Sequence, residues 1–178
     1  NMFKRPTEQG VEISPGIFGG ASWSPMAYNP LLDSLYVAAI HNPTTYYSKA
    51  LQPTAESPWS SYTYSKPAGD QRWGTLTSIA SDTGDIRWQR KTDLPMVGGV
   101  LATAGGIIFT GEGNGNLLGL DATTGEILWR YHAPYGVNAP PITYAVDGKQ
   151  YIAVVAGGNK LFGYKTGDQI LVFALGND

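Results

Sequence analysis

The residue types that catalysis most often uses are sparse in this chain. His41 and His132 have no second histidine or carboxylate at a spacing that would hold a metal ion. Asp121 and Glu126 flank the turn glycine Gly125, where each carboxylate is expected to cap or solvate the turn rather than form an acid–base pair. The sequence contains no Gly-x-Ser-x-Gly nucleophile elbow. These residues therefore predict no self-contained catalytic centre.

One glycine-rich segment and the composition narrow the possible ligands. Residues 111–115 superficially resemble a phosphate-binding loop, but no helical pattern follows them, so a hairpin turn is expected. The formal net charge of −2 and the lack of any Lys/Arg run argue against nucleic acid as a partner. No apolar run reaches the roughly 18 residues of a membrane span. The sequence has no cysteine, which excludes disulfides, thiolate metal sites and covalently attached haem within these 178 residues.

A repeated sequence motif indicates which structural elements position the side chains. Residues 79–88 and 120–129 both contain Thr-Gly-x-x-x-Trp, and their turn glycines, Gly84 and Gly125, lie 41 residues apart. A period of about 40–45 residues with strand-like content is typical of four-stranded propeller blades. We expect each glycine to permit a tight turn, and Trp88 and Trp129 to wedge between neighbouring sheets as structural residues.

The rest of the chain fits an all-β fold. Residues 1–33 are expected to be an approach segment, residues 34–72 a strand plus a long loop, and residues 73–178 the repeat blades with a closing strand, all within a single partial propeller domain. Residues 41–72 show no clear period, which leaves either a loop that covers a site or a disordered loop. About ten strands make roughly two and a half blades. The expected strands are 34–40, 74–80, 86–90, 100–103, 107–111, 117–121, 127–131, 142–146, 150–156 and 170–175.

Several stretches of sequence carry a resemblance to a known family. In this order, residues 19–30, 95–129, 138–144, 147–154, 156–159, 167–168 and 172–175 resemble the C-terminal part of the quinoprotein alcohol dehydrogenases. The resemblance implies the C-terminal blades of an eight-bladed propeller with pyrroloquinoline quinone (PQQ) on its axis and a calcium or lanthanide ion beside it. It also implies oxidation of an alcohol or sugar hydroxyl by hydride transfer to the quinone. In the family, the catalytic base and the metal ligands belong to earlier blades, so this chain is expected to supply neither.

The same resemblance implies partners and a location. Another chain or fragment would supply the remaining blades, and an electron acceptor such as a cytochrome or a quinone would reoxidise the cofactor. The small-molecule substrate would be an alcohol or a sugar, and the compartment would be the periplasm. The unpaired end blades should favour association over an isolated monomer. The alternative is a non-catalytic propeller scaffold or interaction protein that keeps the tryptophan repeat without binding the quinone.

Six residues match family positions near the quinone. Ser22 and Trp23 stand where the family has Asn-Trp, and Met96 stands where methanol dehydrogenases have a tryptophan on the quinone face. Gly157, Gly158 and Asn159 match a segment of the last blade. Structural alternatives stay open for each: core packing for Trp23, gap filling for Met96 and an ordinary turn for residues 157–159.

Overall fold

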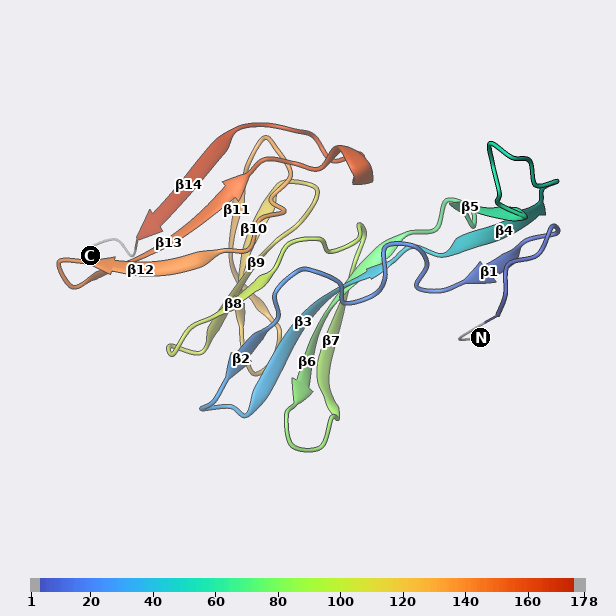
Figure 1. The fold of residues 1–178 in the computed structure, drawn as a ribbon. Coiled ribbons are helices and arrows are strands. Elements are labelled where there is room, and N and C mark those ends of the chain that lie inside the picture. Colours follow the sequence, from blue (N-terminus) through green and yellow to red (C-terminus); the bar gives the residue numbers. More distant parts are fainter. Residues whose placement is uncertain (1–3, 175–178) are drawn as a thin grey trace.

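Three antiparallel sheets follow one another along the chain as blades. The computed structural model describes residues 4–174 (Figure 1). Blade 1 has the strand order β2-β3-β6-β7, blade 2 the order β8-β9-β10-β11, and blade 3 the order β12-β13-β14. The all-β partial propeller expected from the 41-residue period is thus confirmed. The strands of the blades are β2 (Ala27–Asn29), β3 (Ser34–His41), β6 (Trp73–Ala80), β7 (Ile86–Thr92), β8 (Val100–Ala102), β9 (Ile107–Gly111), β10 (Asn116–Asp121), β11 (Ile127–His132), β12 (Ile142–Val146), β13 (Lys149–Ala156) and β14 (Gln169–Ala174).

Tight turns with special backbone conformations join these strands. Gly84 and Gly125 both have positive φ angles, +78° and +73°, in the turns between the third and fourth strands of blades 1 and 2. A residue without a Cβ adopts this conformation freely, which is why Thr-Gly recurs there. Asp147 and Gly148 take φ angles of 50° and 76° in the two-residue turn between β12 and β13.

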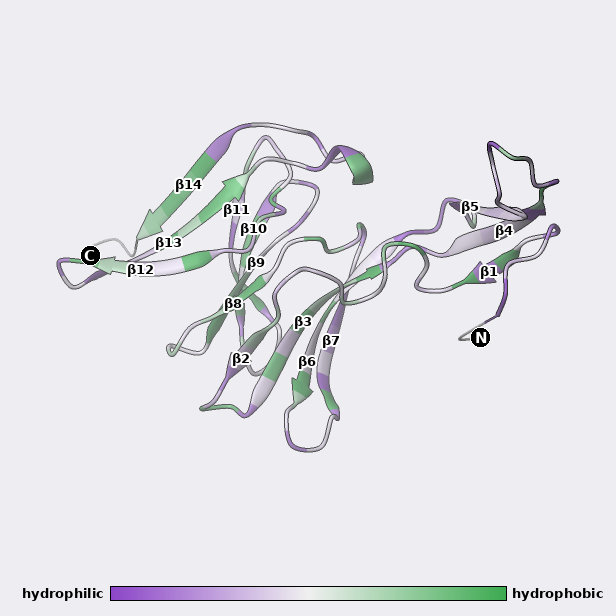
Figure 2. Cartoon of the chain, viewed as in Figure 1, coloured by the Kyte–Doolittle hydropathy of each residue, from purple (hydrophilic) through white to green (hydrophobic). Residues whose placement is uncertain are grey.

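The main cores lie between the blades. Alternate residues of β3 are buried, as a half-buried strand requires. Tyr36 and Leu76 of blade 1 pack with Ile108 and Leu120 of blade 2 in one cluster. A second cluster joins blades 2 and 3. In Figure 2 the apolar colour accordingly runs along parts of β13 and β14.

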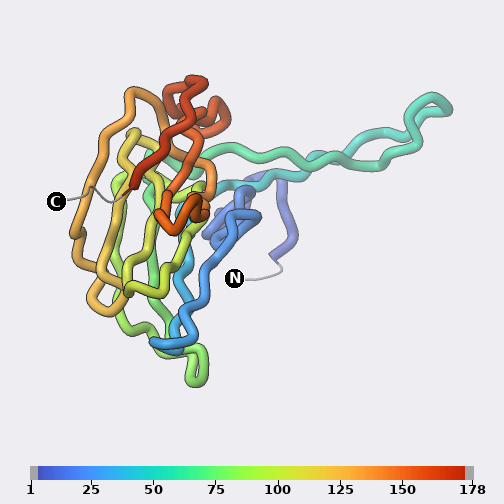
Figure 3. The backbone as a smooth tube through the Cα atoms, turned by 90° about the vertical axis from the view of Figure 1, so that its left-hand side faces the viewer, coloured from blue at the N-terminus to red at the C-terminus, as the bar shows by residue number. Residues whose placement is uncertain are grey.

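Most of the long loop expected over residues 41–72 is instead a hairpin. Strands β4 (Thr44–Ala50) and β5 (Ser61–Pro67) pair along their whole length, and β1 (Val11–Ile13) adds a third strand beside β4. We call these three strands the arm. They were missed because their polar, tyrosine-rich sequence lacks the one-sided apolar alternation of a core strand. The arm projects away from the blades (Figure 3).

Strand direction divides the propeller into two faces. Because successive strands run antiparallel, the second-to-third connection of every blade lies at the same end as the connection to the next blade. We call this end the site face: it carries residues 93–99, 112–115, 133–141 and 157–168, and the arm leaves blade 1 there. A short 3₁₀ helix, η1 (Lys160–Phe162), also lies on this face and was not expected from the sequence.

Gly167 belongs to this face too. It precedes β14 in the connection from the second to the third strand of blade 3, whereas Gly84 and Gly125 follow third strands on the opposite face. Gly167 therefore does not repeat the turn formed at Gly84 and Gly125. This agrees with the prediction of a closing strand over residues 170–175. That strand is β14; its expected last residue, Leu175, lies outside the described residues.

Candidate functional site

The starts of the first strands of all three blades meet on the site face. Pro25 precedes β2, Gly99 precedes β8 and Pro140 precedes β12. A Cβ placed on Gly99 would stand 2.6 Å from Pro25 Cγ and 2.8 Å from Pro140 Cβ, so glycine is required for the three segments to converge. In a propeller the first strands line the central axis, and a ligand bound on that axis would face this convergence point.

Hydrogen bonds connect the family-matched segments around this point. The Ser24 hydroxyl donates to the Val97 carbonyl, and the Val100 amide donates to the Pro25 carbonyl at 3.0 Å. On the other side, the Gly158 amide donates to the Gly136 carbonyl at 2.8 Å. Residues 22–25, 96–100, 136–140 and 157–159 are therefore neighbours in space, although more than 130 residues separate the first from the last.

Ser22 and Trp23 are exposed on this part of the chain. The Trp23 ring is 64% exposed, which does not fit the core-packing alternative for this residue. Ser22 is also exposed and is linked to the convergence point through its neighbour Ser24. An exposed indole ring offers a flat apolar plate, and the serine hydroxyl offers a donor and an acceptor. Both side chains are free to contact a ligand.

Met96 lies in a different environment. Its side chain is 1% exposed and packs in the cluster between blades 1 and 2 with Tyr36 and Leu118. The Met96 amide donates to the Ala39 carbonyl at 3.4 Å. This packing matches the gap-filling alternative, and contact between Met96 and a cofactor stays a prediction that would need the surrounding segment to shift.

Residues 157–159 form the entry to the 3₁₀ turn. Gly158 has a φ of +65°, and a Cβ there would stand 2.0 Å from the Lys165 carbonyl oxygen. The Asn159 carboxamide oxygen accepts a hydrogen bond from the Leu161 amide at 3.0 Å and caps η1. Gly157 has no atom within 3.6 Å of its added Cβ. The requirement for glycine at position 158 thus comes from the chain's own backbone, whereas a Cβ at position 157 would make only ordinary van der Waals contacts.

One polar residue near the convergence point, Asn138, lies in a family-matched stretch and is not among the six predicted site residues. Both polar atoms of the Asn138 carboxamide are buried and have no hydrogen-bond partner within residues 4–174. A Cβ placed on Gly136 would stand 2.9 Å from Asn138 Nδ2. The Asn138 amide therefore lies beside Gly136, whose carbonyl accepts the hydrogen bond from the Gly158 amide. A buried amide without a partner carries a desolvation cost of about 1–3 kcal/mol. Sequence alone gives no signal that an asparagine is unpaired.

Two titratable side chains with shifted pKa values, His41 and Asp33, are engaged in contacts of their own. His41 stacks on Trp73 with 5.1 Å between ring centroids, and its pKa is lowered by burial and by the nearby Lys91 charge. The Asp33 carboxylate, on the opposite face, accepts hydrogen bonds from Ser81 and Tyr28, and both lower its pKa. Among residues 4–174 no group of three or more His, Asp or Glu side chains is placed to hold a metal ion.

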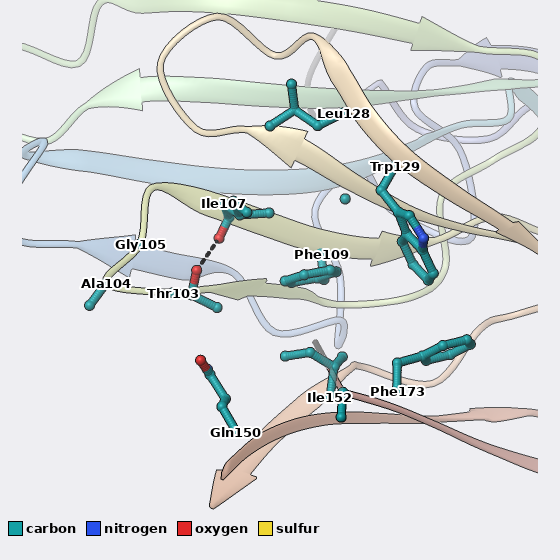
Figure 4. Close-up of a pocket in the computed structure, with 12 residues that line it drawn as sticks. Thr103, Ala104, Gly105, Ile107, Phe109, Leu128, Trp129, Gln150, Ile152 and Phe173 are labelled. Carbon is teal, nitrogen blue, oxygen red and sulfur yellow. Dashed lines mark hydrogen bonds between the residues drawn. The ribbon is translucent and has the colours of Figure 1, made fainter. Parts of the chain in front are cut away.

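A cavity of about 480 Å³ lies elsewhere, between blades 2 and 3 (Figure 4). Phe109, Trp129, Ile152 and Phe173 line it, and none of its lining residues within 4–174 is titratable. Phe109 and Phe173 both meet the Trp129 ring edge-on, at centroid distances of 6.4 and 5.0 Å. The cavity is an apolar opening beside the three-stranded blade and offers no acid–base chemistry. No helix in the described part of the chain is long and apolar enough to cross a membrane.

Known proteins share both the sequence and the fold. The sequence model of the family described as "PQQ: Glucose/ethanol/alcohol dehydrogenase, beta-propeller domain" matches residues 1–152. Quinoprotein ethanol dehydrogenase of Pseudomonas aeruginosa is 37% identical over 148 residues, which are 83% of this chain and 24% of that protein. Lupanine 17-hydroxylase [cytochrome c] of a Pseudomonas species is 39% identical over 160 residues, 89% of this chain and 22% of that protein.

Two solved structures show the same arrangement of strands. Quinohemoprotein alcohol dehydrogenase of Comamonas testosteroni superposes with a TM-score of 0.78 at 27% identity, covering 93% of this chain and 27% of its own. A europium-containing methanol dehydrogenase superposes with a TM-score of 0.70 at 28% identity, covering 85% and 28%. This chain thus spans about a quarter of the length of the relatives that it matches.

Proposed function

The chain belongs to the glucose/ethanol/alcohol dehydrogenase family of PQQ β-propeller proteins, and on this premise we propose that it forms three blades of a PQQ-dependent dehydrogenase. In this proposal the chain supplies part of the wall of the cofactor pocket, and the remaining blades come from another chain or fragment. The substrate class is an alcohol or a sugar hydroxyl. The proposed compartment is the periplasm, and the proposed electron acceptor is a cytochrome or a quinone.

The observation that carries the proposal is the convergence at Gly99. The exposed Ser22–Trp23 pair and the Gly157 backbone belong to segments that are connected to this point, where the first strands of three blades begin. A flat quinone on the axis could be held by an indole plate, a hydroxyl and glycine backbone. When bound, the quinone supplies the hydride acceptor.

The residues present fit such a group in part. Trp23 and Ser22 would contact it directly, since both are exposed. The Asn138 amide, which has no hydrogen-bond partner among residues 4–174, supports the proposal, because a pocket wall completed by a ligand or a bound water would leave such a group unpaired. A calcium or lanthanide ion would be bound mainly by residues outside this chain.

The open end of blade 3 supports the need for partner blades. Ile170 and Val172 of β14 are 74% and 50% exposed, and among residues 4–174 β14 is an edge strand of its three-stranded sheet. Apolar side chains on an unpaired edge favour pairing with another strand. We therefore expect the chain alone to associate, and a sharp monomer peak in sedimentation with cooperative unfolding would contradict this part of the proposal.

Cofactor titration of the complete assembly tests the function. We expect one-to-one PQQ binding, followed by absorbance, and dye-linked oxidation of an alcohol or a sugar after calcium is added. Trp23→Ala should weaken PQQ binding at least 10-fold, which corresponds to about 1.4 kcal/mol. Leu31→Ala is the matched control, because Leu31 is an exposed apolar residue in the β2–β3 turn on the opposite face. The absence of turnover across alcohols, aldoses and aldehydes would overturn the proposal.

The second candidate function is a propeller scaffold without a cofactor. The burial of Met96 and the capping role of Asn159 favour it, because each gives a family-matched residue a purely structural role. Tight PQQ binding by the assembly would exclude the scaffold. Failure to bind PQQ, together with intact assembly, would favour it.

A further inference from the structure

The arm is a single sheet without a second layer. Strand β5 is exposed along almost its entire length, and β4 becomes exposed toward the tip at Lys49 and Ala50. Three short strands with two solvated faces bury too little apolar surface to be stable by themselves. The sequence must therefore stabilise this sheet by contacts within the arm or at its base.

Contacts within one face of the arm supply part of this stability. Tyr47 and Tyr64 are directly paired and stack with 5.0 Å between ring centroids and 12° between planes. Lys66 Nζ lies over both rings, at 5.7 and 5.9 Å from their centroids. Tyr62 extends the stack at 5.7 Å from Tyr64. Cross-strand aromatic and cation–π pairs of this kind each contribute about 0.2–1 kcal/mol, and they stiffen the hairpin.

Contacts at the base fix the direction of the arm. The Arg72 guanidinium donates to the Phe162 carbonyl at 3.1 Å, so the returning leg of the hairpin is attached to η1 of blade 3. Phe18, in the segment that connects β1 to β2, packs against the Phe162 ring with 4.8 Å between ring centroids. The Tyr164 hydroxyl, next to this contact, donates to the Pro95 carbonyl at 2.8 Å. The arm of blade 1 is thus anchored to blade 3 across the site face.

The tip holds one large apolar side chain in solvent. Trp59 is 71% exposed, yet the loop that carries it is ordered: the Leu51 amide donates to the Ser60 carbonyl at 2.8 Å, and the Thr54 amide to the Ser57 carbonyl at 2.9 Å. Because most of its surface is exposed, Trp59 contributes little packing to the described part of the chain. Tryptophan is the side chain most enriched among residues that dominate binding energy at protein interfaces.

We propose that the arm is a docking strut and that Trp59 is its anchor in an apolar pocket on the complementary blades of the dehydrogenase. We take the complementary blades as the binding partner of the arm for two reasons. This chain spans only about a quarter of its relatives' length. A closed ring would also bring the loops of those blades to the site face, from which the arm projects. Each seven-residue leg of the hairpin spans about 23 Å, which carries Trp59 beyond the three blades of this chain. The inference rests on the proposed function, since it needs the ring to be completed.

Site-specific thiol labelling tests the contact without reference to activity. The sequence has no cysteine, so Trp59→Cys and Leu31→Cys each introduce one reactive thiol into this chain, and both replace exposed apolar residues. In the chain alone, maleimide labelling followed by mass spectrometry should modify both sites at similar rates. In the complete dehydrogenase, we expect labelling at position 59 to slow at least 10-fold, while position 31 on the opposite face keeps its rate.

Affinity gives a second measurement. Trp59→Ala should weaken association of this chain with the complementary blades by about 30-fold or more, as loss of an interface anchor worth 2 kcal/mol or more requires. Leu31→Ala should leave the association constant unchanged. Assembly with position 59 still freely labelled, or with unchanged affinity for Trp59→Ala, would overturn the inference alone. Failure of the chain to assemble at all would overturn the proposed function and the inference with it.

Discussion

The indole nitrogen of Trp88 donates a hydrogen bond to the carbonyl oxygen of Ala122 at 3.1 Å, and this bond joins the fourth strand of blade 1 to the turn after the third strand of blade 2. The Tyr36 hydroxyl donates to the same carbonyl at 3.0 Å. The Trp88 ring also lies against Gly125, the turn glycine of the second repeat. The tryptophan of one repeat therefore docks on the turn of the next, which confirms its expected structural role. In blade 3 the corresponding turn would follow Ala174 and lies outside the described residues.

Alanine substitution at the two turn glycines should separate backbone strain from this docking contact. Gly84 and Gly125 have nearly the same φ, but an added Cβ meets nothing within 4 Å at Gly84 and stands 2.7 Å from Trp88 Cε3 at Gly125. We expect Gly84→Ala to cost about 1 kcal/mol through strain at positive φ. Gly125→Ala should cost about 1–3 kcal/mol more, because the Trp88 ring must move. Urea denaturation of both variants measures the difference, and equal costs would show that Trp88 does not press on Gly125.

The shared acceptor makes Trp88 and Tyr36 energetically dependent on each other. Either Trp88→Phe or Tyr36→Phe leaves the Ala122 carbonyl with one donor, so the lost hydrogen bond itself should cost about 0.5–1.5 kcal/mol. The double variant leaves the carbonyl without either donor. We expect its loss in unfolding free energy to exceed the sum of the single losses by about 0.5–2 kcal/mol in a double-mutant cycle. If the loss in unfolding free energy of the double variant equals the sum of the single losses, water replaces the missing donors.

Tyr164 should make the stability of the site face sensitive to alkaline pH. Burial raises the pKa of its hydroxyl to about 12, from an ordinary value near 10. The folded state therefore holds the proton more tightly than the unfolded chain, so stability is retained below pH 10 and falls as the pH rises from 10 towards 12. Tyr164→Phe should flatten this alkaline decline, measured as the free energy of unfolding against pH.

The same substitution has an effect at neutral pH. Without the Tyr164 hydroxyl the buried Pro95 carbonyl loses its donor, which should cost about 1–3 kcal/mol. Tyr62→Phe, at an exposed position on the arm, is the control and should leave the neutral stability unchanged. An unchanged alkaline profile for Tyr164→Phe would contradict the prediction.

Replacing Asn138 should reveal whether its amide awaits a partner. In the chain without cofactor both polar atoms are buried and unpaired, so Asn138→Leu, which has similar volume, should leave stability unchanged or raise it by about 1–3 kcal/mol. In the complete dehydrogenase the same variant should weaken PQQ binding if the amide bonds the cofactor or a water beside it. Thermal denaturation measures the first effect and PQQ titration the second. A destabilised cofactor-free chain would show that Asn138 is already hydrogen-bonded, most simply to an internal water.

Local signals account for the parts of the fold that were predicted well. The expected strands 107–111 and 142–146 coincide with β9 and β12, because glycine or asparagine turns bound them on at least one side. The strands of the arm were missed, since Tyr46, Ser48 and Thr63 give no apolar alternation and the sheet faces solvent on both sides. Strands β1 and β2 have three residues each, too few to show a period.

The features of the candidate site likewise fall into those that the sequence determines and those that depend on the tertiary structure. The sequence by itself determined the repeat, the turns and the family, because each depends on residues close together in the chain or on their order. Only the tertiary structure decided that Trp23 is exposed while Met96 is 1% exposed, that Asn138 has no partner and that the arm is anchored to blade 3 through Arg72. Burial and pairing depend on contacts between residues far apart in the chain, and those contacts are set by how the blades pack against one another.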